Sequence, residues 1–256
     1  MRYPNGLFGW ADLMTRDPGR AIEFYEGLFG WTHVDQPTPM GPPYTQFFKD
    51  GQLVCGLSPM MPGVPEEVGA FWTSYVLVED ADATAAAAEA AGGTVSMPPM
   101  DVMDQGRMAM LADPTGAAVG LWQPAAHQGA DVFNAPGSMT WNELQTRDIE
   151  AALPFYEKVF GWEWDDGPNP GYYVATIAAK EGDDKSNAGA MTTPPGVPDE
   201  APNVWMVYFA VEDCDTSMAA AEGLGGEVFL PAMEMGPGKF GGLIDPTGGM
   251  FLLGSM

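Results

Sequence analysis

The sequence has few cationic residues, few cysteines and few histidines. Its 256 residues contain 10 Lys and Arg against 35 Asp and Glu, which gives a formal net charge of −25 at pH 7. A chain this acidic repels phosphate backbones and anionic lipid, so we expect neither nucleic acid nor a membrane surface as a partner. Cys55 and Cys214 lie far apart, which excludes a disulfide framework and a zinc site made of several thiolates. His33 and His127 are the only histidines, so a site that needs several imidazole side chains is not expected.

Long hydrophobic runs are also missing. No stretch approaches the roughly 18 consecutive apolar residues that a membrane span needs. The first residues show no basic region followed by a long apolar run, so we expect a cytoplasmic protein. Apolar residues nevertheless make up 46% of the chain and aromatic residues 11%. That share is sufficient for a packed core and excludes a wholly disordered chain.

The chain contains a tandem duplication. The segment Trp10–Trp31 recurs as Trp141–Trp162 with 12 of 22 positions identical. Phe71–Gly93 recurs as Val204–Gly226, and the sequence DPTG occurs once in each half, at an offset of 131 to 133 residues throughout. Self-similarity of this kind predicts repeated structural units. We therefore expect a first domain over residues 1–125, a joint over 126–137 and a second domain over 138–256.

Each half divides again into two units with the same pattern. Alternating residues over 9–15 predict a strand, and apolar residues at helical spacing between Asp17 and Gly30 predict a capped helix. Three further strands are expected, and the pattern repeats in the next unit from Phe71 onward, where the strand after the helix is expected over Thr94 to Met97. The expected units cover residues 1–60, 70–125, 138–194 and 203–256. This order predicts an α+β fold in which four βαβββ units form two curled eight-stranded mixed sheets with helices on their outer faces.

These motifs carry a family resemblance. The pattern TxDxxxAxxFYxxxFGW, followed by VEDxDxxxAxxxxxGG and DPTG, resembles the vicinal-oxygen-chelate superfamily, which includes glyoxalase I, bleomycin-resistance proteins and extradiol dioxygenases. The resemblance covers both halves in order. More narrowly, the chain is similar to the two-domain actinobacterial branch that is described as glyoxalase-like or as hydroxylase-like and is found beside antibiotic pathways.

The resemblance also indicates where a metal would bind. Metal-binding members place a His on the first strand of a unit, seven residues before the Asp that caps the helix. They place a Glu on the last strand, seven residues after the Asp of the DP turn. In this chain these positions hold no His and no Glu; they are Trp10, Thr73, Gly120, Trp141, Met206 and Leu252. Because hard divalent ions need several oxygen or nitrogen ligands, we expect no metal and no cofactor.

The main candidate site residues lie on the first strands that carry the metal positions Trp10 and Trp141. Trp10 and Trp141 either form a stacking platform for a flat ligand or fill the space that a metal occupies in the family. Asp12 and Glu143 lie two residues further along, so strand alternation places them on the same face as the two tryptophans. A carboxylate on an apolar face is costly unless it is paired or hydrogen-bonded. They bind a ligand, act as a general base or make structural hydrogen bonds. Other residues expected to line the concave faces are Met14, Tyr75, Met108, Trp122, Gln145, Met206 and Tyr208.

Two functions remain open at this point. The first is a metal-independent protein that encloses an aromatic natural product, with cationic ligands favoured by the net charge, for sequestration or self-resistance. The second is a metal-free tailoring lyase, isomerase or hydroxylase-like enzyme of aromatic polyketide metabolism, with Asp12 or Glu143 as base and Tyr75, Tyr208 or Gln145 holding an oxyanion. A metal-dependent glyoxalase or dioxygenase is disfavoured. The expected partner is a small molecule, and the protein is either a monomer or a homodimer.

Overall fold

The computed structural model describes residues 2–39, 41–167, 169–235 and 238–255. The four helices are α1 (Pro18–Phe29), α2 (Ala81–Ala90), α3 (Ile149–Phe160) and α4 (Cys214–Gly223). The strands of the first half are β1 (Phe8–Thr15), β2 (Thr32–Gln36), β3 (Tyr44–Lys49), β4 (Gln52–Pro59), β5 (Phe71–Leu77), β6 (Thr94–Val102), β7 (Gly106–Ala112) and β8 (Ala118–Pro124). Those of the second half are β9 (Met139–Thr146), β10 (Glu163–Asp166), β11 (Tyr172–Thr176), β12 (Ser186–Thr192), β13 (Val204–Ala210), β14 (Glu227–Met235), β15 (Gly238–Ile244) and β16 (Met250–Ser255). The strand-helix-strand-strand-strand order thus occurs four times, as the sequence predicts.

The helices begin where the sequence places their caps. The side chain of Asp17 accepts a hydrogen bond from the Arg20 amide, and Asp80 accepts one from the Ala83 amide. These bonds satisfy backbone donors that the first turn of a helix leaves free. Helix α1 ends at Gly30 with a φ of 65°, a left-handed conformation that glycine adopts without steric cost.

Each half of the chain forms one mixed eight-stranded sheet. The strand order is β2-β3-β4-β1-β5-β8-β7-β6 in the first sheet and β10-β11-β12-β9-β13-β16-β15-β14 in the second. In every repeat the first strand pairs in parallel with the last one, as β1 does with β4, and the remaining pairings inside the repeat are antiparallel. The predicted α+β class and the two mixed sheets are therefore confirmed. Within the described ranges, no helix is long and apolar enough to cross a bilayer.

Strand β6 is longer than the sequence pattern predicts. The predicted strand stops at Met97, just before Pro98 and Pro99. In the structure β6 continues to Val102, with shifts in its pairing register to β7 between Val95 and Met100. Proline cannot donate to a sheet ladder, but an edge strand with bulges tolerates it. Strand β6 is the last strand of its sheet, so it meets that condition.

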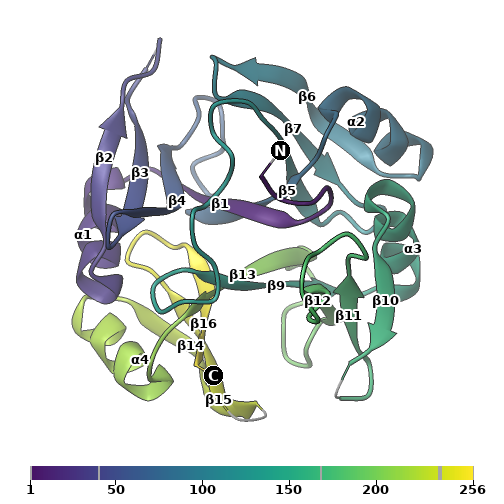
Figure 1. Ribbon diagram of the computed structural model, residues 1–256. Coiled ribbons are helices and arrows are strands. Elements are labelled where there is room, and N and C mark those ends of the chain that lie inside the picture. The colour runs from purple at the N-terminus through teal and green to yellow at the C-terminus, as the bar shows by residue number, and fades with distance from the viewer. Residues whose placement is uncertain (1, 40, 168, 236–237, 256) are drawn as a thin grey trace. The chain divides into compact units, whose positions relative to one another are not determined.

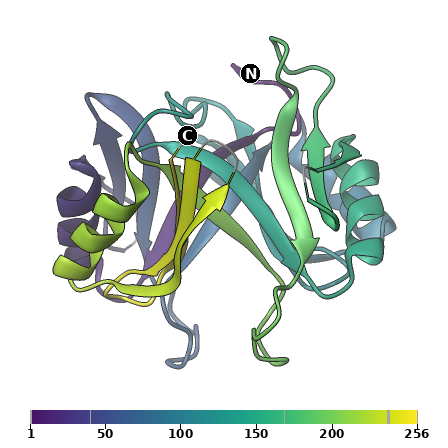
Figure 2. The same cartoon turned by 90° about the horizontal axis from the view of Figure 1, so that it is seen from below.

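The chain packs into two compact units that interleave the halves. Unit 1 contains Met1–Trp10, Ser74–Gly129 and Trp141–Met206, and unit 2 contains Ala11–Thr73, Ala130–Thr140 and Val207–Met256. Each unit thus combines one repeat of the first half with one repeat of the second. Figures 1 and 2 show α2 beside α3 in unit 1 and α1 beside α4 in unit 2. Each sheet is thus formed by one half of the chain, whereas each unit contains repeats of both halves.

A buried tyrosine connects repeats from different halves of the chain in unit 2. The hydroxyl of Tyr25, on α1, donates to the Asp245 carboxylate at 2.8 Å and accepts from the Trp72 indole N–H at 3.0 Å. Asp245 belongs to the second DPTG turn, where it also accepts from the Thr247 amide. The FY motif of one half therefore docks on the DPTG motif of the other half.

Unit 1 contains the reciprocal arrangement. The hydroxyl of Tyr156, on α3, donates to Asp113 at 2.9 Å and accepts from the Trp205 indole N–H at 2.8 Å. Burial raises the pKa of Tyr156, and the Asp113 charge adds to the shift. The motifs that make the duplication visible in the sequence thus have structural roles in both units.

Candidate functional site

The strand registers identify the last-strand positions at which the family resemblance implies a metal ligand, including the two that the sequence motifs left unassigned. Gly120 lies directly opposite Tyr75, and Leu252 lies opposite Tyr208. In the other two repeats the corresponding positions are Gly56, which lies opposite Asp12, and Gly189, which lies opposite Glu143. Three of these four last-strand positions are therefore glycine, and none carries a ligand side chain.

Tyrosine side chains occupy the space above these three glycines. A Cβ atom added to Gly56 would overlap the hydroxyl of Tyr44, and one added to Gly189 would overlap the hydroxyl of Tyr172. At Gly120 the overlap would be with the ring of Tyr75. A glutamate could not be placed at these positions without moving a tyrosine.

A polar cluster surrounds Glu143 in unit 1. Glu143 is only 5% exposed, and its carboxylate accepts a hydrogen bond of 3.0 Å from the Gln145 side-chain amide. Tyr172 accepts from the Trp141 indole N–H at 2.9 Å and is also hydrogen-bonded to Glu143. Burial, and then the charge of Glu143, raise the pKa of Tyr172, so this hydroxyl keeps its proton and donates to the carboxylate. We call Trp141, Glu143, Gln145 and Tyr172 the Glu143 cluster.

Unit 2 contains a smaller counterpart around Asp12. This carboxylate is 8% exposed, and the Tyr44 hydroxyl donates to it at 3.2 Å. Met14 occupies the position that corresponds to Gln145 and is half-buried. The neighbouring Cys55 is fully buried, and burial together with the Asp12 charge raises the pKa of its thiol. Cys55 is therefore not a ready thiolate nucleophile.

The other candidate residues differ in how deeply they are buried and in what they contact. The indole of Trp10 is 3% exposed and makes an edge contact of 4.4 Å between ring centroids with His127. Trp122 also contacts His127 and donates to its backbone carbonyl at 2.9 Å. Tyr75, Met206 and Tyr208 are buried, whereas Trp141, Gln145 and Met108 are half-buried. The contact of the joint residue His127 with Trp10 was not predicted.

Sequence reasoning also missed Tyr44 and Tyr172. Both begin the third strand of their repeat, but the loops around these strands differ in length between the halves. The two tyrosines are therefore 128 residues apart, outside the offset of the duplicated motifs. A search for tyrosines at strand starts opposite glycines could have found them.

Unit 2 also has a shallow pocket away from Asp12. Its volume is about 250 Å³, and it lies beside the start of α1 and the second DPTG turn. Its lining includes Arg16, Asp17, Arg20, Glu66 and Thr247. Its charged lining residues are exposed and carry both signs, so they do not select a particular ligand.

The equivalent corner of unit 1 differs at one position. Asn203 occupies the position that corresponds to Ala70. Its side chain accepts a hydrogen bond from the Arg147 amide at 3.0 Å and donates one to the Thr115 carbonyl at 2.7 Å.

The arrangement of repeats agrees with a comparison against protein families. The family described as Glyoxalase/Bleomycin resistance protein/Dioxygenase superfamily matches residues 7–121 and 138–252. The chain belongs to this superfamily. A protein of Mycobacterium tuberculosis named "Putative glyoxylase CFP32" is 42% identical over 97% of this chain and 94% of its own length. The anthracycline biosynthesis protein DnrV of Streptomyces peucetius is 38% identical over 98% of this chain and 93% of its own length.

The fold is also shared with solved structures. The Mn(II)-bound glyoxalase from Novosphingobium aromaticivorans superimposes with a TM-score of 0.65 over 99% of this chain and 83% of that chain, at 15% identity. At this identity the likeness concerns the fold alone.

A divalent metal ion of the kind bound by other members does not fit the residues at the inherited positions. These positions hold indoles, a thioether, a hydroxyl, a leucine and glycines, and tyrosine side chains occupy the space over three of the glycines. Nowhere in the described part of the chain do three or more His, Cys, Asp or Glu residues gather closely enough to hold a metal ion. Hard divalent ions prefer several carboxylate, carbonyl or imidazole ligands, which these positions do not supply.

Proposed function

We propose that this protein is a metal-independent small-molecule binding protein that encloses an aromatic natural product. The observation that carries this proposal is the Glu143 cluster, which combines a buried carboxylate, a phenol, an amide and an indole beside the inherited metal position. A buried carboxylate is costly unless it is hydrogen-bonded. Here the protein supplies donors to Glu143, and the half-buried indole of Trp141 beside it offers an aromatic surface for a flat ligand.

The chemistry of the cluster favours a hydroxylated or cationic aromatic compound. The Glu143 carboxylate accepts hydrogen bonds from ligand hydroxyl or ammonium groups, and the Trp141 ring stacks on aromatic rings or interacts with a cation. The net charge of −25 further favours cationic ligands over anionic ones.

The relatives support the same class of ligand. DnrV is named for anthracycline biosynthesis, and it matches this chain over nearly its whole length. Aromatic polyketides are flat, hydroxylated and in some cases carry an amino sugar, which agrees with the chemistry of the Glu143 cluster. We propose sequestration or self-resistance in the cytoplasm as the role of this binding.

Fluorescence titration tests the binding function. Cationic aromatic compounds should quench the fluorescence of the parent protein, and Trp141→Leu should reduce that quenching and weaken binding. Phe71→Leu, at an exposed position, is the matched control and should bind like the parent. Absence of quenching by every cationic and hydroxylated aromatic compound tried would contradict the proposal.

A second candidate is a metal-free tailoring enzyme that acts on the same class of compound. The buried carboxylates of Asp12 and Glu143 favour it, because a buried carboxylate can take a substrate proton as general base, and the negative charge that then develops on the substrate is held by nearby hydrogen-bond donors. In this role Glu143 or Asp12 is the base and Gln145, Tyr75 or Tyr208 orients the substrate oxygen. Glu143→Gln separates the two functions: an enzyme loses turnover, whereas a binding protein keeps its affinity for neutral ligands.

A further inference from the structure

Four methionines lie opposite one another on the β6–β7 hairpin of unit 1. Met97 pairs directly with Met110, and Met100 pairs directly with Met108. Residues directly opposite in antiparallel strands have Cβ atoms about 4.5–5.5 Å apart. Met108 and Met110 are two residues apart on β7, which corresponds to about 7 Å along the strand. We call these four residues the methionine cluster.

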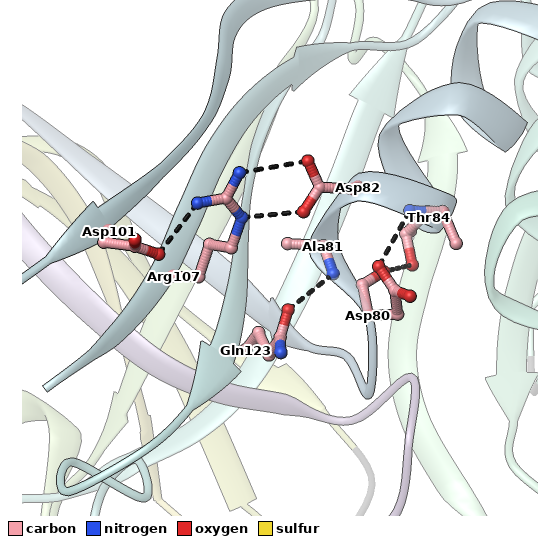
Figure 3. Close-up of polar contacts among 8 residues, drawn as sticks. Asp80, Ala81, Asp82, Thr84, Asp101, Arg107 and Gln123 are labelled. Carbon is pink, nitrogen blue, oxygen red and sulfur yellow. Dashed lines mark hydrogen bonds and ion pairs between the residues drawn. The ribbon is translucent and has the colours of Figure 1, made fainter. Parts of the chain in front are cut away.

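The opposite face of β7 is occupied by other residues. Arg107 points to helix α2, where its guanidinium binds both carboxylate oxygens of Asp82 at 2.7 and 3.0 Å (Figure 3). Ala109 is fully buried. Because neighbouring residues on a strand face opposite sides, Met108 and Met110 share the other face.

The bulge in β6 brings the remaining two methionines to that same face. Met97 and Met100 are three residues apart, so a regular strand would place them on opposite faces. Pro98 and Pro99 lie between them, and the register to β7 shifts at this point, so three steps on β6 match two on β7. The register shift therefore aligns both methionines with their partners.

The cluster is not required by the fold. In the equivalent β14–β15 hairpin of unit 2, the corresponding pairs are Leu230 with Gly242 and Met233 with Phe240. Nor is the cluster a closed core, since Met100 is 48% exposed and its three companions are half-buried. All four methionine side chains are thus partly open to solvent.

We propose that the methionine cluster binds a soft monovalent cation, Cu(I), through its thioether sulfurs. Thioethers are soft ligands that select Cu(I) over hard ions such as Mg²⁺ or Ca²⁺. Methionine has a long, flexible side chain, so sulfurs from two adjacent cross-strand pairs can converge on one ion. The charge of −25 attracts cations to the protein. This site uses none of the inherited metal positions and no residue of the Glu143 cluster, and Met108 is its one member among the residues expected to line a concave face.

Titration of the intact protein with Ag(I), a redox-inert analogue, and with Cu(I) under anaerobic conditions tests the site. In protein with ¹³C-labelled methionine methyl groups, one equivalent of either ion should shift four methionine signals. The double substitution Met108→Leu/Met110→Leu keeps apolar side chains of similar size and should weaken binding at least about tenfold. Met233→Leu in the equivalent hairpin should bind like the parent.

A second double substitution protects the test against a folding defect. Met97→Leu/Met100→Leu alters only the edge strand and should give the same loss. Cys55 and Cys214 are present in every variant, so reaction at a thiol would persist in all of them. Ion binding of equal strength in the parent and in both double variants, or methionine signals that do not shift, would overturn the proposal.

Discussion

The two carboxylate sites are built from equivalent strands, yet they differ in a side chain that lies beside the carboxylate. In unit 1, Glu143 is held by a phenol and by the amide of Gln145. In unit 2, Asp12 is held by the Tyr44 hydroxyl, and Met14 replaces the amide. A thioether cannot donate a hydrogen bond. Duplication thus preserved the position of the acid and of its tyrosine, while the amide donor of one site became a thioether in the other.

The buried tyrosine–aspartate pairs show the opposite behaviour, since they are the same in both units. Tyr25 with Asp245 and Tyr156 with Asp113 have matching partners and hydrogen-bond distances of 2.8 and 2.9 Å. These structural contacts are therefore maintained in both units, whereas the carboxylate sites, the β6–β7 hairpin and the hydrogen bonds of Asn203 differ from their counterparts in unit 2.

The largest expected effect is the loss of a tyrosine–aspartate pair. Asp113→Ala leaves the buried Tyr156 hydroxyl and the amides of the DPTG turn without their acceptor, and should cost about 3–5 kcal/mol of unfolding free energy. Asp245→Ala should cost a similar amount in unit 2. Urea unfolding of both variants measures this. A loss below about 1 kcal/mol in either variant would show that the two units are not equivalent.

A smaller effect is expected at the glycines beneath the tyrosines. Gly189→Ala and Gly56→Ala place a Cβ against the hydroxyls of Tyr172 and Tyr44, and should destabilise the protein by about 1–3 kcal/mol. Gly223→Ala is the control, because its Cβ would meet nothing within 4 Å and it lies in helix α4. That control should be neutral or slightly stabilising. Thermal unfolding distinguishes these outcomes, and equal midpoints in all three variants would contradict the overlap.

Ligand binding should distinguish the two carboxylates. Glu143→Gln should weaken the binding of a cationic aromatic compound about tenfold, which is ~1.4 kcal/mol, because it removes the charge beside the half-buried Trp141, whereas Trp10, on the strand of Asp12, is buried. Asp12→Asn should change that affinity less. The two constants come from fluorescence titrations at equal ionic strength. An equal or larger loss for Asp12→Asn would reverse the assignment.

The smallest effect concerns alkaline pH. The pKa values of Tyr25, Tyr156 and Tyr172 are raised, first by burial and then by a neighbouring carboxylate. Above the ordinary tyrosine pKa of about 10, the unfolded chain releases these protons while the folded chain retains them. Stability is therefore complete below pH ~10 and falls as the pH rises above it. Tyr172→Phe should reduce the steepness of this fall in urea unfolding measured between pH 9 and pH ~11. An unchanged steepness would show that Tyr172 titrates normally.

The fold could be read largely from the sequence because its signals are local. Asp17 and Asp80 mark helix starts, and Gly30 marks a helix end, since capping involves residues three or four apart. The exception, the end of β6, depends on its place at the sheet edge, which makes Pro98 and Pro99 acceptable.

The candidate site was less accessible to sequence reasoning. Asp12, Trp141 and Glu143 could be selected because alternation and the duplicated motif point to them. Tyr44 and Tyr172 could not, because they reach the carboxylates from another strand across glycines that look featureless in the sequence. The link between Trp10 and His127 likewise joins residues more than a hundred positions apart.

The amino-acid sequence alone therefore determined the duplication, the order of the elements and the absence of inherited metal ligands, because each depends on residue identity at short, regular spacing. The tertiary structure alone decided which repeats pack together, which phenols reach Glu143 and Asp12, and that four methionines share one face of a hairpin. Those outcomes depend on strand register and on contacts between distant segments, which local spacing does not encode.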